Sequence, residues 1–328
     1  TLPNLLDKAG VRKKSFELRL ERMEFSVLHL IIDTLVFLLY SLVLLIIIRS
    51  KTKVFKSAFY SIFVATGFAD IASLFSACSL RVIRESSLGE GSKNFALFYI
   101  LISYTSFMAH MIGNLLITIN RYSALCLMNM YSKIWTRKHV LAAIVIQYFI
   151  SIDVFAHTIR AHVEYIPGAN GTAIIKGIQE REIDLIIRFT YIVTCIIYAA
   201  TSLGLNIRLL IEWKRLTKVD GVLERTHHDK GLLIYALLVF SGSMLVCIQQ
   251  FVKFISVITN NIPLNLWATL QYSWLNGVMV SIPPFSLIML SSDFRHEILN
   301  FFGCARHQSC TPLFVTQHSS RRSAADRF

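Results

Sequence analysis

The chain has 328 residues, of which 54% are hydrophobic and 16% are charged, and its formal net charge is +13. Soluble domains carry about 25% charged residues, so a composition this apolar excludes an ordinary water-soluble domain. The basic residues lie between apolar blocks instead of gathering on one segment, which argues against nucleic acid as a partner.

Neither the N-terminal residues nor the cysteines of the chain show a motif for a specific function. The first 24 residues contain six basic side chains and no apolar run of signal-peptide length, so we expect the first membrane helix to act as its own insertion signal. The six cysteines show no CxxC or metal-ligand spacing, so neither a disulfide scaffold nor a metal or other cofactor is expected. They are Cys78, Cys126, Cys195, Cys247, Cys304 and Cys310.

Seven apolar segments are each long enough to cross a membrane, since a helix needs about 20 mostly apolar residues to span the hydrocarbon core. They occupy residues 25–48, 57–80, 95–119, 140–159, 185–205, 231–251 and 266–290. The polar connectors between them are too short to fold independently. The pattern predicts an all-α membrane protein, a seven-transmembrane-helix bundle in which every backbone hydrogen bond closes inside a helix.

The connectors differ sharply in their content of Lys and Arg. Nineteen lie in the first, third and fifth loops and the C-terminal tail, against seven in the second, fourth and sixth loops. The positive-inside rule therefore predicts an N-terminus outside and a C-terminus in the cytoplasm, although the basic N-terminal tail runs against it. The one Asn-x-Ser/Thr sequon, at Asn170, falls in the fourth loop, which this topology places outside, so Asn170 is the candidate glycosylation site.

Polar residues lie deep within the second, third and seventh segments. Asp70 lies about 20 Å from the cytoplasmic end of its helix at 1.5 Å per residue, and His110 and Asn276 fall at a similar depth. A lone carboxylate at that depth is costly, so we expect Asp70 and His110 to face each other inside the bundle with Asn276 close by. Such a cluster could bind an ion or relay movement between helices, or it could be a static packing network.

The third segment ends at the cytoplasmic side in Asn120-Arg121-Tyr122. A guanidinium at a helix end can reach water or hold neighbouring helices, and it could exchange partners when the bundle opens. The three residues are therefore the candidate coupling switch. The alternative is that Arg121 serves only as a positive-inside anchor.

Polar and aromatic side chains near the outer face are candidates for a ligand pocket. Three ionisable pairs have i, i+4 spacing, namely His29 with Asp33, Asp153 with His157, and Asp184 with Arg188. Aromatic residues at this level also occur as ordinary interfacial belt residues, and that alternative stays open. The pocket candidates are Tyr99, Tyr104, Gln249, Gln250 and Tyr272.

An amphipathic helix is expected directly after the seventh segment. Ser292 or Asp293 can cap it, and Gly303 can stop it. Such a helix would lie on the inner leaflet, where Cys304 and Cys310 are candidate palmitoylation sites or else unmodified thiols. The domains are then an N-terminal tail over 1–24, the bundle over 25–292, and a cytoplasmic amphipathic helix and tail over 293–328. The apolar stripe of the short helix consists of Phe294, Ile298, Phe301 and Phe302.

Three local patterns resemble the serpentine receptor class gamma chemoreceptors of nematodes, with the related class V as the nearest rival. The first reads Ser57-Ala58-Phe59-Tyr60-Ser61-Ile62-Phe63-Val64 and then Ala69-Asp70-Ile71. The second runs from Ile117 through Asn120-Arg121-Tyr122 to Leu125 and continues into Tyr131-Ser132-Lys133-Ile134-Trp135. The third runs from Pro283-Pro284-Phe285 to Ser291-Ser292-Asp293-Phe294-Arg295.

The resemblance implies a chemosensory receptor that couples an extracellular small-molecule ligand to a heterotrimeric G protein, in the plasma membrane and on sensory cilia. The chain departs from the family pattern because it lacks a proline shortly after Arg121-Tyr122. The second cytoplasmic loop is therefore expected to differ in shape. A transporter is the main rival, but the chain shows no repeated halves and no Gly/Pro-interrupted helices apart from Pro283-Pro284. No nucleophile motif or metal-ligand spacing points to an enzyme.

Overall fold

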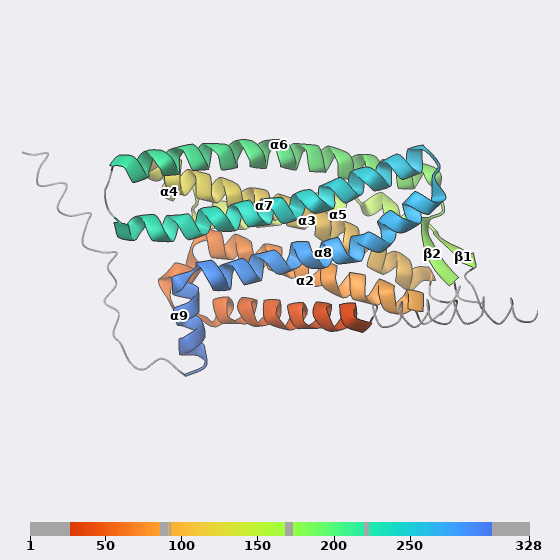
Figure 1. Ribbon diagram of the computed structural model, residues 1–328, viewed down its shortest axis with the longest axis horizontal. Coiled ribbons are helices and arrows are strands. Elements are labelled where there is room, and N and C mark those ends of the chain that lie inside the picture. The colour runs from red at the N-terminus through yellow and green to blue at the C-terminus, as the bar shows by residue number, and fades with distance from the viewer. Residues whose placement is uncertain (1–26, 86–90, 92, 168–172, 220–222, 304–328) are drawn as a thin grey trace, which may run out of the picture.

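The computed structural model describes residues 27–85, 91, 93–167, 173–219 and 223–303. Seven long helices lie side by side in one elongated bundle, as Figure 1 shows, and each is apolar enough to cross a membrane. The predicted seven-helix membrane fold is therefore confirmed. They are the first helix (Val27–Arg49), α2 (Ala58–Glu85), α3 (Lys93–Cys126), α5 (Arg137–Asp153), α6 (Arg181–Val219), α7 (Leu223–Ile258) and α8 (Ile262–Leu290).

Most of these helices are longer than the apolar segments predicted from the sequence. Helices continue past the hydrocarbon core with polar turns, which a hydropathy argument does not detect. The extension matters at Arg81, which the sequence places just outside the second segment but which lies within α2 with a side chain only 4% exposed.

Short elements connect the helices. A 3-10 turn, η1 (Lys53–Lys56), joins the first helix to α2, and α4 (Met128–Ile134) forms the connection between α3 and α5. After α5 the span is completed by a second 3-10 turn, η3 (Ala156–Arg160).

The fourth loop contains a β-hairpin, which the sequence analysis did not predict. Strand β1 (Val163–Pro167) pairs antiparallel with β2 (Ala173–Ile178), and a register shift lies between Glu164 and Tyr165. Both strands are rich in β-branched residues, which favour a pleated surface. Asn170, between the strands, lies outside the described residues.

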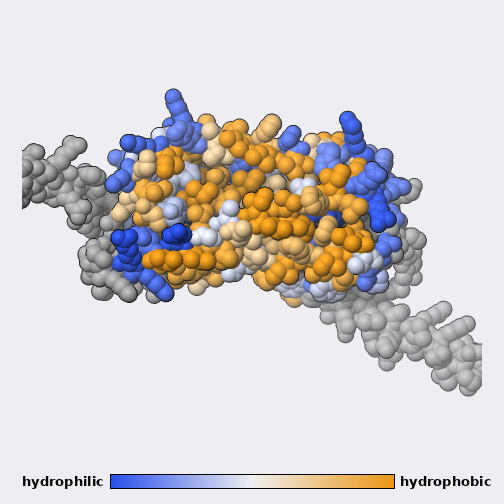
Figure 2. Space-filling view, turned by 90° about the horizontal axis from the view of Figure 1, so that it is seen from above, coloured by the Kyte–Doolittle hydropathy of each residue, from blue (hydrophilic) through white to orange (hydrophobic). Residues whose placement is uncertain are grey.

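The surface has a broad apolar belt between two polar ends, as Figure 2 shows. Large apolar side chains point outward along this belt, with Phe149 68% and Met289 73% exposed. Exposure of this extent over several helices fits a lipid surround, because soluble monomers rarely expose continuous apolar patches of more than a few hundred Å². The belt is what a multi-pass membrane protein requires.

The helix after the seventh span is α9 (Ser292–Phe301). Its N-cap is Ser291, whose Oγ accepts a hydrogen bond from the Phe294 N–H at 3.2 Å, so the expected caps Ser292 and Asp293 are wrong by one or two positions. The Phe294 side chain is fully buried, whereas Phe301 and Phe302 are exposed. Gly303, at φ +70°, ends the helix in the left-handed conformation that favours glycine. Cys304 and Cys310 lie outside the described residues.

Gly113 lets α3 approach α2 and α5 closely. A Cβ at this position would overlap the Thr66 side chain and lie 2.7 Å from Gln147 Nε2. Neither neighbour yields easily, because Thr66 is β-branched and the Gln147 amide donates to the Ala109 carbonyl oxygen at 2.8 Å. The glycine is therefore a packing requirement of the bundle.

We predict that Gly113→Ala destabilises the protein by about 1–3 kcal/mol, the usual range for overpacking a filled site. The control is Gly204→Ala on α6, where a Cβ meets nothing within 4 Å and the higher helix propensity of alanine should leave stability unchanged or slightly raised. Both are measured as the melting temperature of the detergent-solubilised protein. A Gly113→Ala melting temperature at or above that of the unmodified protein would contradict the packing argument.

Candidate functional site

A buried polar network occupies the middle of the bundle. Asp70 Oδ1 lies 2.5 Å from His110 Nδ1, and the Tyr40 hydroxyl donates to Asp70 Oδ2 at 2.7 Å. The three side chains are 1% exposed or less. The contact between Asp70 and His110 expected from the sequence is thus present, and the Tyr40 hydroxyl of the first helix, which the sequence analysis did not consider, satisfies the second carboxylate oxygen.

Polar groups flank both ring nitrogens of His110. Nδ1 faces the Asp70 carboxylate, and Nε2 lies 2.7 Å from Asn114 Nδ2. Asn114 Oδ1 has no hydrogen-bond partner, so rotating this amide would present its oxygen to the ring in place of its nitrogen. The hydrogen bonds of the network therefore have more than one arrangement.

The network reaches two further helices. The Ser243 hydroxyl of α7 lies 3.4 Å from His110 Nε2. Asn276 of α8 accepts from the Ser73 hydroxyl at 2.9 Å, one helical turn from Asp70 on α2. Asn276 is therefore bonded to Ser73, one turn along α2 from the cluster, and not to Asp70. The hydrogen bonds of the cluster itself connect the first helix, α2, α3 and α7.

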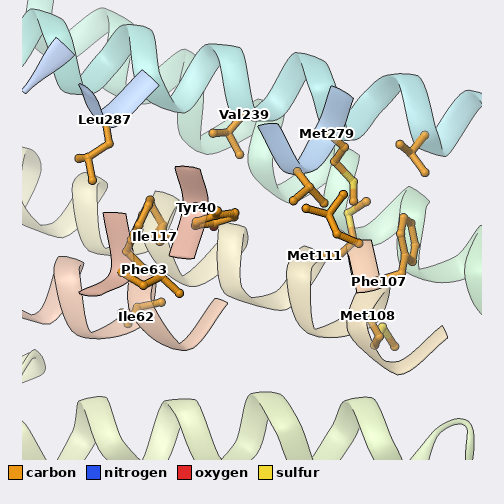
Figure 3. Close-up of a cluster of buried hydrophobic side chains, with 14 of the residues drawn as sticks. Tyr40, Ile62, Phe63, Phe107, Met108, Met111, Ile117, Val239, Met279 and Leu287 are labelled. Atoms are coloured by element: carbon orange, nitrogen blue, oxygen red, sulfur yellow. The ribbon is translucent and has the colours of Figure 1, made fainter. Parts of the chain in front are cut away.

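An apolar layer separates this network from the end of the bundle where Arg121 lies. Figure 3 shows the buried side chains Phe63, Ile117, Val239 and Leu287, from four helices, in this region. Beyond it, the Arg121 guanidinium carbon lies 3.8 Å from the centroid of the Phe59 ring, a cation–π geometry. Arg121 is thus held against α2 at the boundary of the apolar layer.

The connection after Arg121 is more ordered than the sequence suggested. Asn120 Nδ2 donates to the Tyr131 hydroxyl of α4 at 3.3 Å, and Trp135 Nε1 donates to Ser123 Oγ at 2.5 Å. Tyr122 is half-buried beside them. These bonds attach α4 to the end of α3, so the segment without the usual proline forms a short helix.

At the opposite end of the bundle, Arg188 occupies a charged and aromatic site. Its Nη2 lies 3.0 Å from Asp184 Oδ1, its side chain is 4% exposed, and its Nε has no hydrogen-bond partner. The guanidinium carbon lies 6.0 Å from the centroid of the Tyr104 ring. A cavity of about 180 Å³ opens beside Asp184 and Arg188, lined also by Ser256, Asn261 and Asn265.

The other pocket candidates differ in whether their side chains point into the bundle. The Tyr272 hydroxyl lies 3.1 Å from Ser103 Oγ, and Tyr104 packs on Tyr191 with ring centroids 5.4 Å apart, so both point into the bundle. Gln249 donates to the Ala268 carbonyl oxygen at 2.7 Å and joins α7 to α8. Tyr99 is half-buried and packs against the exposed Phe75 and Phe98, and its place in a pocket stays a prediction.

Two of the three expected i, i+4 pairs are not formed. Asp33 pairs with Arg81 of α2 at 3.2 Å instead of with His29, whose ring packs on Trp274 with centroids 3.6 Å apart. Asp153 ends α5 while His157 belongs to η3, so the two do not share one helix face. The pair of Asp33 and Arg81 is a further buried ion pair of the bundle, beside those of Asp70 with His110 and Asp184 with Arg188.

The hairpin is attached to the start of α6 by Glu180. Its carboxylate accepts from the His162 backbone N–H at 2.8 Å and lies 2.6 Å from the His162 ring Nδ1. These two hydrogen bonds hold the pKa of the Glu180 carboxyl below its usual value. Within the described part of the chain, no group of three His, Cys, Asp or Glu side chains could hold a metal ion.

We predict that Asp70→Asn and His110→Gln each destabilise the protein strongly, since breaking a buried pair costs about 3–5 kcal/mol. The double variant should lose less than the sum of the two, because neither remaining side chain then leaves a buried charge. Thermal unfolding can be followed with a thiol-reactive dye that labels the buried Cys195 and Cys247. Asp153→Asn, at an exposed position, is the control. Additive losses would show that the two residues act independently.

Comparison with known proteins places this architecture in a family. No curated protein matches the chain. The family model of the serpentine type 7TM GPCR chemoreceptors, Srv, matches residues 29–304, which include nearly all of the seven helices. This is a family of receptors and not of enzymes or transporters. The match supports the resemblance to nematode serpentine chemoreceptors. The class is Srv, whereas the local motifs favoured class gamma. The chain belongs to the Srv family of serpentine seven-transmembrane chemoreceptors.

Proposed function

We propose that this chemosensory receptor binds a small molecule at the Arg188 end of the bundle and passes the change to a heterotrimeric G protein at the Arg121 end. The observation that carries the proposal is the buried network around Asp70 and His110, which connects four helices, with the bond from Ser73 to Asn276 of α8 one helical turn away. A ligand that moves one of these helices alters hydrogen bonds on the others. A coupled network of this kind supports a switch between discrete arrangements.

The cavity beside Arg188 supports a restricted class of ligand. Its volume of about 180 Å³ is close to that of the engineered cavities of about 150 Å³ that bind benzene. The partnerless Nε of Arg188 offers a buried N–H donor next to it. A compact molecule with a hydrogen-bond acceptor would satisfy that donor and fill the space.

The proposed orientation puts this cavity and the hairpin outside and α9 in the cytoplasm. The asymmetry of basic residues in the loops supports it. In that orientation Asn170 belongs to an outer loop and is a candidate for glycosylation, and Cys304 and Cys310, which follow α9 in the sequence, are candidates for palmitoylation. The receptor would act at the plasma membrane of sensory cilia.

We predict that Asn170→Gln removes a glycosidase-sensitive mass from the receptor expressed in animal cells, because Asn170 is the acceptor in the sequon between β1 and β2. An epitope tag on the C-terminus should stain only after the cells are permeabilised. Staining of that tag on intact cells would contradict the orientation, whether or not Asn170 is modified.

We predict that Arg121→Ala lowers ligand-dependent G-protein activation at least tenfold while surface expression stays near normal. The reason is that the substitution removes the guanidinium held against Phe59, the group proposed to exchange partners on activation. Activating compounds are first found by screening small volatile and ascaroside-like molecules on cells that express the receptor.

The matched control is Arg215→Ala, which removes the same type of side chain from an exposed position on α6. If Arg121→Ala activated the G protein fully at the same surface level as the unmodified receptor, the switch role would be wrong. Arg121 would then serve only as a membrane anchor. Failure of every compound to activate the unmodified receptor, in cells where a known receptor does activate the same G protein, would count against the proposed coupling.

A further inference from the structure

A second cavity lies at the cytoplasmic end of the bundle, away from both sites described above. Its volume is about 550 Å³, within the range of ordinary ligand pockets. It is bounded by the end of the first helix, the η1 turn, the starts of α2 and α5, and Trp135. The lining residues that matter for its chemistry are Ile48, Lys56, Tyr60, Ser61, Val64 and Arg137.

The polar half of this cavity is built for an anion. Two basic side chains, Lys56 and Arg137, line it, and no Asp or Glu does. The nearby carboxylate of Glu297 on α9 is bonded to the Thr52 hydroxyl at 3.3 Å and is not part of the lining. Negative charge entering the cavity therefore meets two cations and no lining carboxylate.

The helix directions add to this preference. Helix α2 begins at Ala58 and α5 begins at Arg137, and both residues line the cavity. The first-turn N–H groups and the positive ends of both helix dipoles are directed to this end of the molecule. The hydroxyl of Ser61 supplies a further polar group in the lining.

The other half of the cavity is apolar. Ile47, Ile48, Val64 and Val140 line it, and the Ile48 side chain is 57% exposed on the apolar surface of the first helix. A free phosphate would leave these side chains without a partner. A molecule with a charged head and a hydrocarbon body would use both halves.

We propose that this cavity is a binding site for an anionic phospholipid, with the phosphate and headgroup between Lys56 and Arg137 and the start of the acyl chains against Ile48 and Val64. The bilayer supplies this ligand at the boundary where the cavity lies, at the end of the bundle that carries most of the basic residues. Trp135 lines the same cavity and donates to Ser123 near Arg121, so an occupied site would stabilise the connection formed by α4.

The experiment measures lipid binding to the purified full-length receptor, by native mass spectrometry and by the melting temperature in detergent with added lipid. The probes are phosphatidylserine, phosphatidylcholine of the same acyl chains, and soluble glycerophosphoserine, which carries the same headgroup without chains. We expect phosphatidylserine to bind at least tenfold more tightly than either of the other two.

The test variant is Lys56→Gln with Arg137→Gln, and we expect it to bind phosphatidylserine about thirtyfold more weakly, as two lost basic contacts predict. The control is Lys53→Gln with Lys133→Gln, which changes the net charge equally at exposed positions outside the cavity and should bind normally. A third variant, Lys56→Arg with Arg137→Lys, keeps the charge and should retain binding. Melting temperatures without lipid show that each variant is folded.

Three results would overturn the proposal. Equal loss in the control pair would indicate attraction to the general surface charge. Equal binding of glycerophosphoserine would assign the cavity to a free phosphate compound, and equal binding of phosphatidylcholine would remove the role of the negative charge. None of these measurements depends on the chemosensory ligand or on G-protein coupling.

Discussion

The cost of placing a carboxylate in the middle of a membrane bundle governs the arrangement of this protein. Asp70 is fully buried, and its two oxygens are satisfied by His110 on one neighbouring helix and Tyr40 on another. Insertion scales put the penalty for a lone Asp at the centre of a membrane helix at about 2.5–3.5 kcal/mol, so these partners are a condition of the fold. Because each partner belongs to a different helix, the hydrogen bonds to Asp70 position three helices. The contact of His110 with Ser243 adds α7, and the bond between Ser73 and Asn276 joins α2 to α8 nearby.

The same interaction explains how a rigid bundle can also respond. Apolar packing holds the helices above and below the network, but its hydrogen bonds have alternatives, as the partnerless oxygen of Asn114 shows. Displacement of a helix at the Arg188 end would first change the hydrogen bonds around Asp70 and His110. The change would then be transmitted through the apolar layer to Arg121. The ion pair of Asp33 and Arg81, buried at 3.2 Å, joins the first helix to α2. In the proposed function we expect displacements of α6, α7 and α8 to carry the signal.

The two ends of the bundle have different chemistry for physical reasons. The Arg188 end combines a compact cavity with a buried pair of opposite charges and aromatic rings, which suits recognition of one small molecule. The end proposed to be cytoplasmic combines basic side chains, helix N-termini and a partly apolar cavity, which suit a lipid surface. Helix α9 fits the same boundary, since Phe294 is buried against the bundle while Phe301 and Phe302 remain exposed.

The sequence by itself determined the seven spans, because the length and polarity of each apolar run are local properties, and the depth of Asp70 and His110, because helical rise is constant. It also identified the pair of Asp184 and Arg188, whose partners are one helical turn apart. Only the tertiary structure decided the partners that lie on other helices. Asp33 was expected to pair with His29 four residues away but pairs with Arg81, because the rotation of each helix about its axis depends on packing such as the close approach at Gly113.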